Sequence, residues 1–210
     1  KLWMLGEERL SVLQALDEPP ATLAFSPDGR RLAVGSGHRL LVYPIQDGQG
    51  GAPEIVDMVL EDGRSMGQVT SVRFDESGQL FAATWDGGVS AHEEANGWAP
   101  AVIPGPWETA NAVAPLPGNH LAVSGTDRER QGSVWIVEDV GNIWARLDCY
   151  SEDCRALATD STGRWLVAAN SRQEIVWWDL EHLAALGDGI GEMDATDQLA
   201  SNGCGCGSVD

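Results

Sequence analysis

The sequence predicts an all-β fold assembled from a repeated antiparallel meander, and three observations support this. One pattern occurs four times: an apolar strand, a polar turn with glycine, a strand with small residues, a polar loop and a final apolar strand. The turn glycines of the four copies, Gly29, Gly78, Gly118 and Gly163, are 49, 40 and 45 residues apart. Single apolar runs lie between the copies, where a fourth strand would fit. Repeats of this length are typical of the four-stranded blades of a β-propeller.

The segment before the first full copy, residues 1–16, has the pattern of the last two strands of a blade. The fourth copy stops after its third strand, at "VWWDL" (176–180). We therefore expect a strand from residues 1–16 to pair with the fourth copy and close the ring. Such closure removes exposed sheet edges, which otherwise act as templates for aggregation.

The blades are expected near residues 17–60, 66–105, 108–150 and 152–180. Asp28 and Gly29 illustrate the turn chemistry, because glycine reaches positive φ without a Cβ clash and aspartate can bond the local backbone. In the second strands small residues follow large apolar ones, as in "WLVAAN" (165–170). Strands that converge on a propeller axis need this taper.

Two of the copies carry a family resemblance. "FSPDGRRLAVGS" (25–36) followed by "LLVYPI", and "DSTGRWLVAAN" (160–170) followed by "IVWWDLE", resemble the blades of WD-repeat β-propellers. Trp178-Asp179 is the one literal Trp-Asp pair, and no Gly-His dipeptide precedes the inner strands. The similarity covers about residues 1–187 and implies a propeller domain of that extent. Propellers have about 4–8 blades, so the chain is a self-contained four-blade ring, a piece of a longer propeller, or a ring that another chain completes.

The end of the chain, residues 188–210, has the composition of an acidic tail with glycine and cysteine, and is expected to be short helical or irregular structure. "EHLAALGDG" (181–189) resembles the helical tail that follows the last blade in many bacterial members. No apolar run reaches the ~20 residues of a membrane helix, and no signal peptide is recognisable. We therefore expect a cytoplasmic protein that does not insert into membranes. Arginine strongly outnumbers lysine, which suggests a bacterium with GC-rich DNA.

The chain is strongly acidic, with 13 Lys and Arg against 32 Asp and Glu and a net charge of −19. Polyanions are repelled by such a surface, so nucleic acid is not an expected partner. The charge either attracts a basic protein partner over a long range or only keeps a repeat protein soluble.

Some of the few basic residues are expected on one face. In the WD-repeat arrangement, the loops between strands two and three and those leading into the next blade share one side of the disc. These loops hold His38, Arg39, Arg64, Trp85, Trp107, Arg128, Arg130 and Arg172. Arginine and tryptophan often anchor interfaces, which predicts a partner-binding face. The alternative is that these loops are merely polar and that Trp107 tucks under its own "PGPW" turn.

The sequence contains one G-x-S-x-G match, "GRSMG" (63–67), but it lies between two strand patterns and not at the strand-to-helix turn that this nucleophile motif requires. The phosphate-loop motif G-x-x-x-x-G-K-[ST] is absent. We therefore do not expect an enzyme. The sequence favours a protein-protein interaction module, or a scaffold subunit of a multiprotein assembly, that binds a protein partner through the loops named above.

The four cysteines form two pairs, Cys149 with Cys154 and Cys204 with Cys206. Their thiolates can supply the four ligands of a zinc site, or the C-x-C pair alone can hold Cu(I) or act as a redox pair. Under this alternative the propeller carries a functional tail that binds metal or is the target of a modifying enzyme. If the pairs are unrelated, no cofactor is expected.

Overall fold

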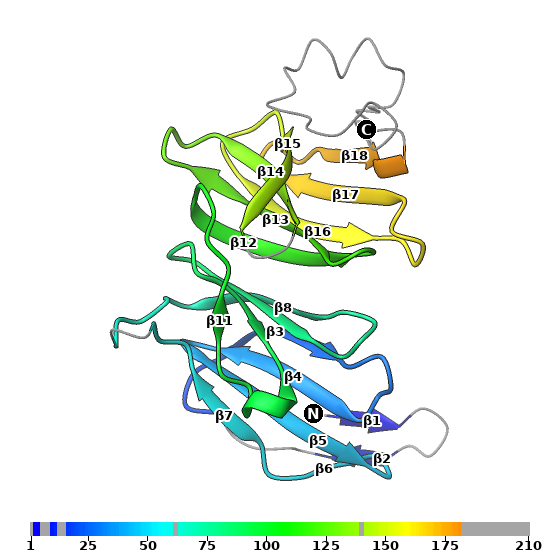
Figure 1. Ribbon diagram of the computed structural model, residues 1–210. Coiled ribbons are helices and arrows are strands. Elements are labelled where there is room, and N and C mark those ends of the chain that lie inside the picture. The colour runs from blue at the N-terminus through cyan, green and yellow to red at the C-terminus, as the bar shows by residue number, and fades with distance from the viewer. Residues whose placement is uncertain (1, 5–8, 12–15, 61–62, 139–140, 182–210) are drawn as a thin grey trace.

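The computed structural model describes residues 2–4, 9–11, 16–60, 63–138 and 141–181 (Figure 1). Within these ranges the regular structure is almost entirely β-strand, with one 3-10 turn, η1 (Glu94–Asn96). All strand pairs are antiparallel. The predicted all-β class is therefore confirmed.

Four sheets follow one another along the chain, and an N-terminal hairpin precedes them. The hairpin pairs β1 (Leu2–Met4) with β2 (Arg9–Ser11). Sheet I contains β3 (Pro20–Phe25), β4 (Arg31–Ser36), β5 (Arg39–Gln46), β6 (Gln49–Gly50) and β7 (Glu54–Asp57). Sheet II contains β8 (Val69–Phe74), β9 (Leu80–Thr84), β10 (Val89–His92) and β11 (Ala101–Val102). Sheet III contains β12 (Trp107–Leu116), β13 (His120–Asp127), β14 (Gly132–Glu138) and β15 (Asn142–Asp148). Sheet IV contains β16 (Cys154–Thr159), β17 (Trp165–Asn170) and β18 (Ile175–Asp179).

The turn between the first two strands follows one design in sheets I and IV. Gly29 and Gly163 both have φ of 69°, a left-handed conformation that glycine adopts without a Cβ clash. Asp28 accepts hydrogen bonds from the Ser26 hydroxyl at 2.6 Å and the Arg30 amide at 3.0 Å. Asp160 likewise accepts hydrogen bonds from the Thr162 hydroxyl and, at 2.8 Å, from the Trp165 amide. These bonds favour the ionised carboxylates and lower the pKa of both aspartates.

The first strands of the sheets lie side by side, β3 against β8, β8 against β12 and β12 against β16. Each carries a register irregularity at the same place, before Thr22, Ser71, Ala112 and Ala156. Two of these residues bridge to the next sheet. The Val72 amide donates to the Thr22 hydroxyl at 3.2 Å, and the Val113 amide donates to the Ser71 hydroxyl at 3.3 Å. The shared bulge is structural evidence that the sheets are repeats of one unit.

Three apolar cores hold neighbouring sheets together. Leu40, Val42 and Met58 of sheet I and its following loop pack on Val72 and Leu80 of sheet II. A second core joins sheets II and III and contains Val89, Val113, Leu121, Val123 and Trp135. A third core joins sheets III and IV and contains Val134, Ile136, Leu157, Leu166 and Trp178. The hydrophobic material thus lies between the sheets rather than in one central core.

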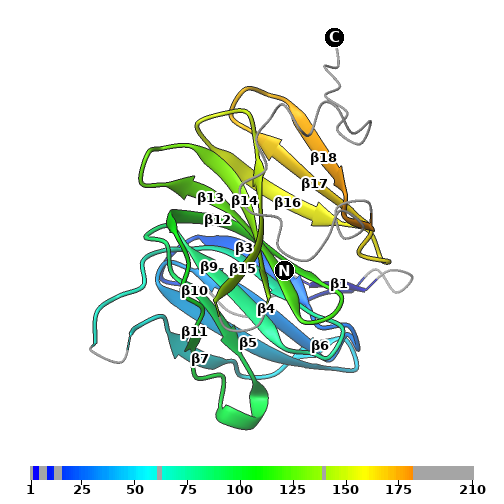
Figure 2. The same cartoon turned by 45° about the horizontal axis from the view of Figure 1, so that its top comes forward.

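The four sheets form an open succession, with sheets I and IV at its two ends (Figures 1 and 2). The residues that the structure describes do not show the expected pairing of residues 1–16 with the fourth copy. Among the described residues β1 and β2 pair only with each other, and β18 pairs only with β17. Sheet IV consequently has three strands, and the hairpin lies beside sheet I instead (Figures 1 and 2).

Candidate functional site

We define the loop face as the side formed by the loops after the second and fourth strands, at the left of Figure 1. It comprises residues 37–38, 58–60, 63–68, 85–88, 103–106, 128–131, 149–153 and 171–174. Because the strands alternate in direction, these loops lie opposite the turns that join the first two strands. All eight residues predicted to bind a partner lie at or beside these loops.

Backbone hydrogen bonds tie the loops of the loop face to one another. The Val69 amide donates to the Gly37 carbonyl at 2.7 Å, which links sheets I and II. The Trp85 amide donates to the Gln68 carbonyl at 2.8 Å, and the Ser171 amide donates to the Asp153 carbonyl at 3.0 Å. The loops therefore have fixed positions on the sheets, and little ordering is needed before another molecule can bind.

Trp85 is the one exposed tryptophan among those whose side chains the structure describes, with 56% of its surface accessible. It begins the turn between β9 and β10. Beside it the Thr84 hydroxyl, itself buried, accepts the Gly88 amide at 2.9 Å. The turn thus presents a large aromatic ring to solvent from a rigid base.

Trp107 is buried, which argues against the predicted contact with a partner. It is 7% exposed, its indole N–H donates to the Gly87 carbonyl at 2.8 Å, and its ring lies 5.7 Å from that of Trp135. Trp107 starts β12 and packs between sheets II and III. It is a core residue, as the alternative of a tryptophan tucked into the structure foresaw.

Three arginines of the loop face are exposed and form no ion pair with any described residue: Arg128, Arg130 and Arg172. Arg128 and Arg130 lie in the loop between β13 and β14, where Asp127 accepts the Glu129 and Gln131 amides at 2.9 Å. These three guanidinium groups are available to an incoming acidic group.

The basic residues contributed by sheet I are already partly neutralised. Arg39 donates from Nε to Asp57 at 3.0 Å and lies 3.8 Å from Asp17. The His38 ring nitrogen Nδ1 is 3.8 Å from a Glu18 carboxylate oxygen. Arg64 is exposed in the loop before β8. The eight predicted residues therefore divide into a buried tryptophan, an acid-paired group, and an exposed group around sheets II to IV.

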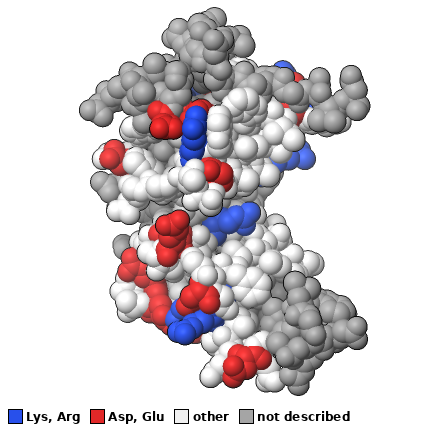
Figure 3. All heavy atoms as spheres, turned by 90° about the vertical axis from the view of Figure 1, so that its right-hand side faces the viewer, with Lys and Arg blue, Asp and Glu red and all other residues white. Residues whose placement is uncertain are grey.

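On the opposite face, which carries the turns between first and second strands, two arginines are in ion pairs. Arg164 pairs with Asp179 at 2.7 Å and Glu181 at 3.4 Å, and Arg31 pairs with Glu94. Figure 3 shows this side, with basic groups beside acidic ones. A hollow of about 430 Å³ lies here between sheets III and IV, with Pro117 in its lining. Arg164 and Arg31 are less available than the arginines of the loop face, whereas Arg30 is exposed and forms no ion pair with any described residue.

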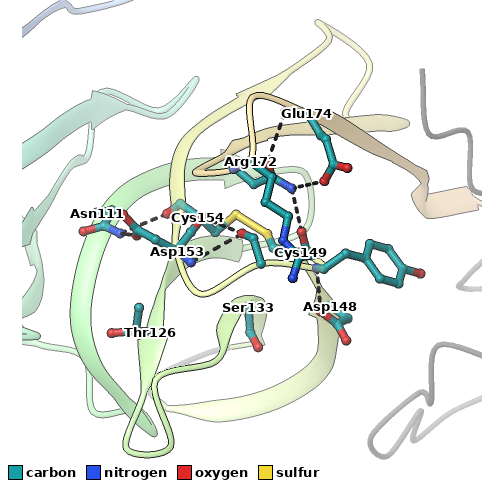
Figure 4. The surroundings of a disulfide bond; sticks show 12 residues. Asn111, Thr126, Ser133, Asp148, Cys149, Asp153, Cys154, Arg172 and Glu174 are labelled. Atoms are coloured by element: carbon teal, nitrogen blue, oxygen red, sulfur yellow. Dashed lines mark hydrogen bonds between the residues drawn. A yellow bond between two sulfur atoms is a disulfide. The ribbon is translucent and has the colours of Figure 1, made fainter. Parts of the chain in front are cut away.

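Cys149 and Cys154 are joined by a disulfide at the crossing from sheet III to sheet IV, and both are fully buried (Figure 4). Asn170 donates to the Cys149 carbonyl at 2.9 Å and Asn111 donates to the Cys154 carbonyl at 3.0 Å. Sulfurs in a disulfide are not thiolate ligands, so the predicted four-cysteine zinc site requires this bond to be reduced. Cys204 and Cys206 lie outside the described residues, as does the rest of the tail.

His92 was not singled out as important by the sequence, yet it is the most buried histidine that the structure describes. Its Nδ1–H donates to the Trp98 carbonyl at 2.7 Å, which can only accept, so Nε2 accepts the Ser90 hydroxyl at 2.8 Å. Burial lowers the pKa of His92, against the smaller raising effect of the Trp98 bond. His92 therefore joins β10 to the Trp98 segment as a buried hydrogen-bonding group.

Within the described part of the chain, no group of three or more His, Cys, Asp and Glu residues is placed to hold a metal ion. The same residues include no helix with the length and apolar character needed to cross a membrane. No protein-family model matches the chain, and comparison with curated proteins finds no match either.

Proposed function

We propose that the chain is a protein-protein interaction module of β-propeller type, related to WD-repeat domains, that binds a protein partner through part of its loop face. The binding region is formed by Trp85, Arg128, Arg130 and Arg172, from sheets II, III and IV. The observation that carries the proposal is the exposure of Trp85 on the same face as three arginines without ion pairs among the described residues.

Physical reasons favour these residues as anchors. Tryptophan buries a large area and also offers an N–H group, and arginine makes directional contacts with carboxylates. Because the loops are hydrogen-bonded to the sheets, little contact energy is lost in ordering them. Although the whole chain is acidic, a partner with an apolar pocket flanked by carboxylates fits this region.

Side-chain substitution tests the proposal. Trp85→Ala combined with Arg128→Ala should weaken partner binding by more than ~2 kcal/mol, since truncated anchors cost at least that much. Tagged wild type and variant are compared as baits in extracts of the native host, and each captured protein is quantified by mass spectrometry. A genuine partner is recovered by the wild type and reduced more than about tenfold with the variant.

Ile143→Ala is the matched control, because Ile143 is 45% exposed but lies on the outer strand β15. It should recover the partner as the wild type does. Equal capture by the wild type and the double variant, with both folded by circular dichroism, would contradict the proposed region.

A further inference from the structure

The two end sheets expose apolar positions that are buried in the interior sheets. The four sheets can be aligned on the first residue after the shared bulge in each first strand. That residue pairs with one in the second strand, which in turn pairs with one in the third strand, and these third-strand residues are equivalent. These residues are Leu40, Val89, Val134 and Ile175. The first three are completely buried by the sheet that follows, whereas Ile175, in the last sheet, is 50% exposed.

In the first strands, the exposed apolar position lies in the first sheet instead of the last. The second residue after the shared bulge is Leu23 in sheet I, Val72 in sheet II, Val113 in sheet III and Leu157 in sheet IV. Val72, Val113 and Leu157 are 0–5% exposed because the preceding sheet covers them. Leu23 is 60% exposed, and its neighbour Phe25 is 48% exposed.

These two kinds of position meet in every interior core. Each core contains one of these third-strand positions together with one of these first-strand positions. The pairs are Leu40 with Val72, Val89 with Val113, and Val134 with Leu157. Within the described chain, Ile175 therefore has no first-strand residue of a following sheet packed on it. Leu23 has no third-strand residue of a preceding sheet packed on it. The chain itself displays the surface that would cover each of its open ends.

We propose that the open face of sheet IV packs on the open face of sheet I of a second copy, and that the reciprocal contact closes a two-fold ring. Each chain contributes four sheets, so two copies give eight, within the ~4–8 units of known propellers, whereas three copies would exceed it. Contact within one chain would require the three interior cores to repack, because the end sheets lie apart (Figures 1 and 2).

The apolar residues on the two end faces support this arrangement. On sheet I, Leu41 is 5% exposed and clusters with Leu16, whereas Leu23 of β3 and Ile55 of the outer strand β7, which pairs with Leu41, are 60% and 56% exposed. The open apolar surface of sheet I therefore includes residues of both its inner and its outer strand. The open face of sheet IV also carries Trp177, which is half-buried against the Trp165 ring at 5.1 Å.

The net charge of the two copies opposes the association and makes its affinity depend on the salt concentration. Each copy carries a net charge of −19, so two copies repel each other at low ionic strength. Added salt screens this repulsion while the apolar contact remains. The dimer should therefore strengthen as the salt concentration rises, contrary to an association held by ion pairs.

Sedimentation equilibrium of the purified chain tests the proposal with two variants and a control. At moderate salt and micromolar concentration the wild type should have twice the chain mass of 22.4 kDa. Ile175→Asp or Leu23→Asp alone should raise the dimer Kd by more than ~100-fold, because each interface then buries an unpaired carboxylate. Ile143→Asp, a comparably exposed site on β15, should remain dimeric.

Mixing distinguishes this head-to-tail contact from other arrangements. Tagged Ile175→Asp should capture untagged Leu23→Asp, because one of the two interfaces in that pair is intact, but it should not capture untagged Ile175→Asp. A monomeric wild type would overturn the proposal, and would favour closure within the chain or by a different protein. A dimer that survives both substitutions, or a mixture that captures nothing, would overturn it as well.

Discussion

Tryptophans show how the same residue type takes different roles in this chain. Trp85 is exposed on a rigid turn, Trp107 and Trp135 pack together between sheets, and Trp165 lies under the Arg164 guanidinium at 5.0 Å. The sequence placed Trp85 and Trp107 in two different kinds of loop on the same face of the predicted disc. What separates them is the neighbouring chain: Gly105, whose missing side chain leaves room for the Trp107 ring, has no counterpart beside Trp85.

Trp107→Ala should destabilise the fold by about 3–5 kcal/mol, since it removes a buried aromatic ring and its hydrogen bond to Gly87. Trp85→Ala should change the stability by less than about 0.5 kcal/mol, as surface substitutions usually do. Urea unfolding followed by circular dichroism measures both. Equal destabilisation by the two changes would contradict the assignment of Trp107 to the core and Trp85 to the surface.

His92 should make stability depend on pH. Its pKa is lowered in the folded state, so at pH values below about 6.5 the unfolded chain binds a proton that the folded chain does not. This contribution is complete above pH 6.5 and is lost as the pH falls toward the folded pKa, by at most ~1.4 kcal/mol per pH unit. His92→Gln does not titrate and should reduce the fall in unfolding free energy between pH 7.5 and 5.5. An unchanged pH profile would show that His92 is not the responsible group.

At the scale of single elements, the sequence predicted the turns and strands but not the pairing between segments far apart in the chain. The turns at Gly29 and Gly163 and the runs of apolar residues follow rules that act over a few residues, and the structure contains the strands they predict. The pairing of residues 1–16 with β18 depends on how the whole chain curves, and among the described residues β1 and β2 pair only with each other. The buried state of Trp107 and the Cys149–Cys154 bond also depend on contacts that no short pattern encodes.

The Cys149–Cys154 disulfide closes a short loop between sheets III and IV, and its removal should cost about 2 kcal/mol. Replacing both residues by serine and measuring urea unfolding tests this value, with Cys204→Ser and Cys206→Ser together as the control. Loss of stability on adding a metal chelator would instead favour a zinc site made from the thiols.

Deletion of residues 1–16 should destabilise sheet I, because Leu16 clusters with the buried Leu32, Val34, Leu41 and Tyr43. Full exposure of each such side chain costs roughly 1.5–3 kcal/mol, a large share of a total stability of ~5–15 kcal/mol. A differential scanning calorimetry experiment should show a lower melting temperature than for the full chain. Deletion of residues 188–210 is the comparison, and should leave it nearly unchanged. An unaltered melting temperature after the first deletion would contradict the role of this segment.

The whole molecule is an open series of equivalent sheets with two distinct surfaces. The loop face presents Trp85, Arg128, Arg130 and Arg172, and the end faces present Leu23 and Ile175. The first suits a different protein and the second suits another copy of the chain, so partner binding and self-association use separate residues. A variant that abolishes one should therefore preserve the other.

Site-specific photo-crosslinking tests the central claim, that the loop face binds a protein partner, most directly. A photoreactive phenylalanine derivative is placed at position 85 in one variant and at position 143 in another, and each is irradiated in the native host. We predict a covalent adduct with a different protein from position 85 and none from position 143. Absence of an adduct at position 85, or an adduct there with a second copy of this chain, would contradict the account.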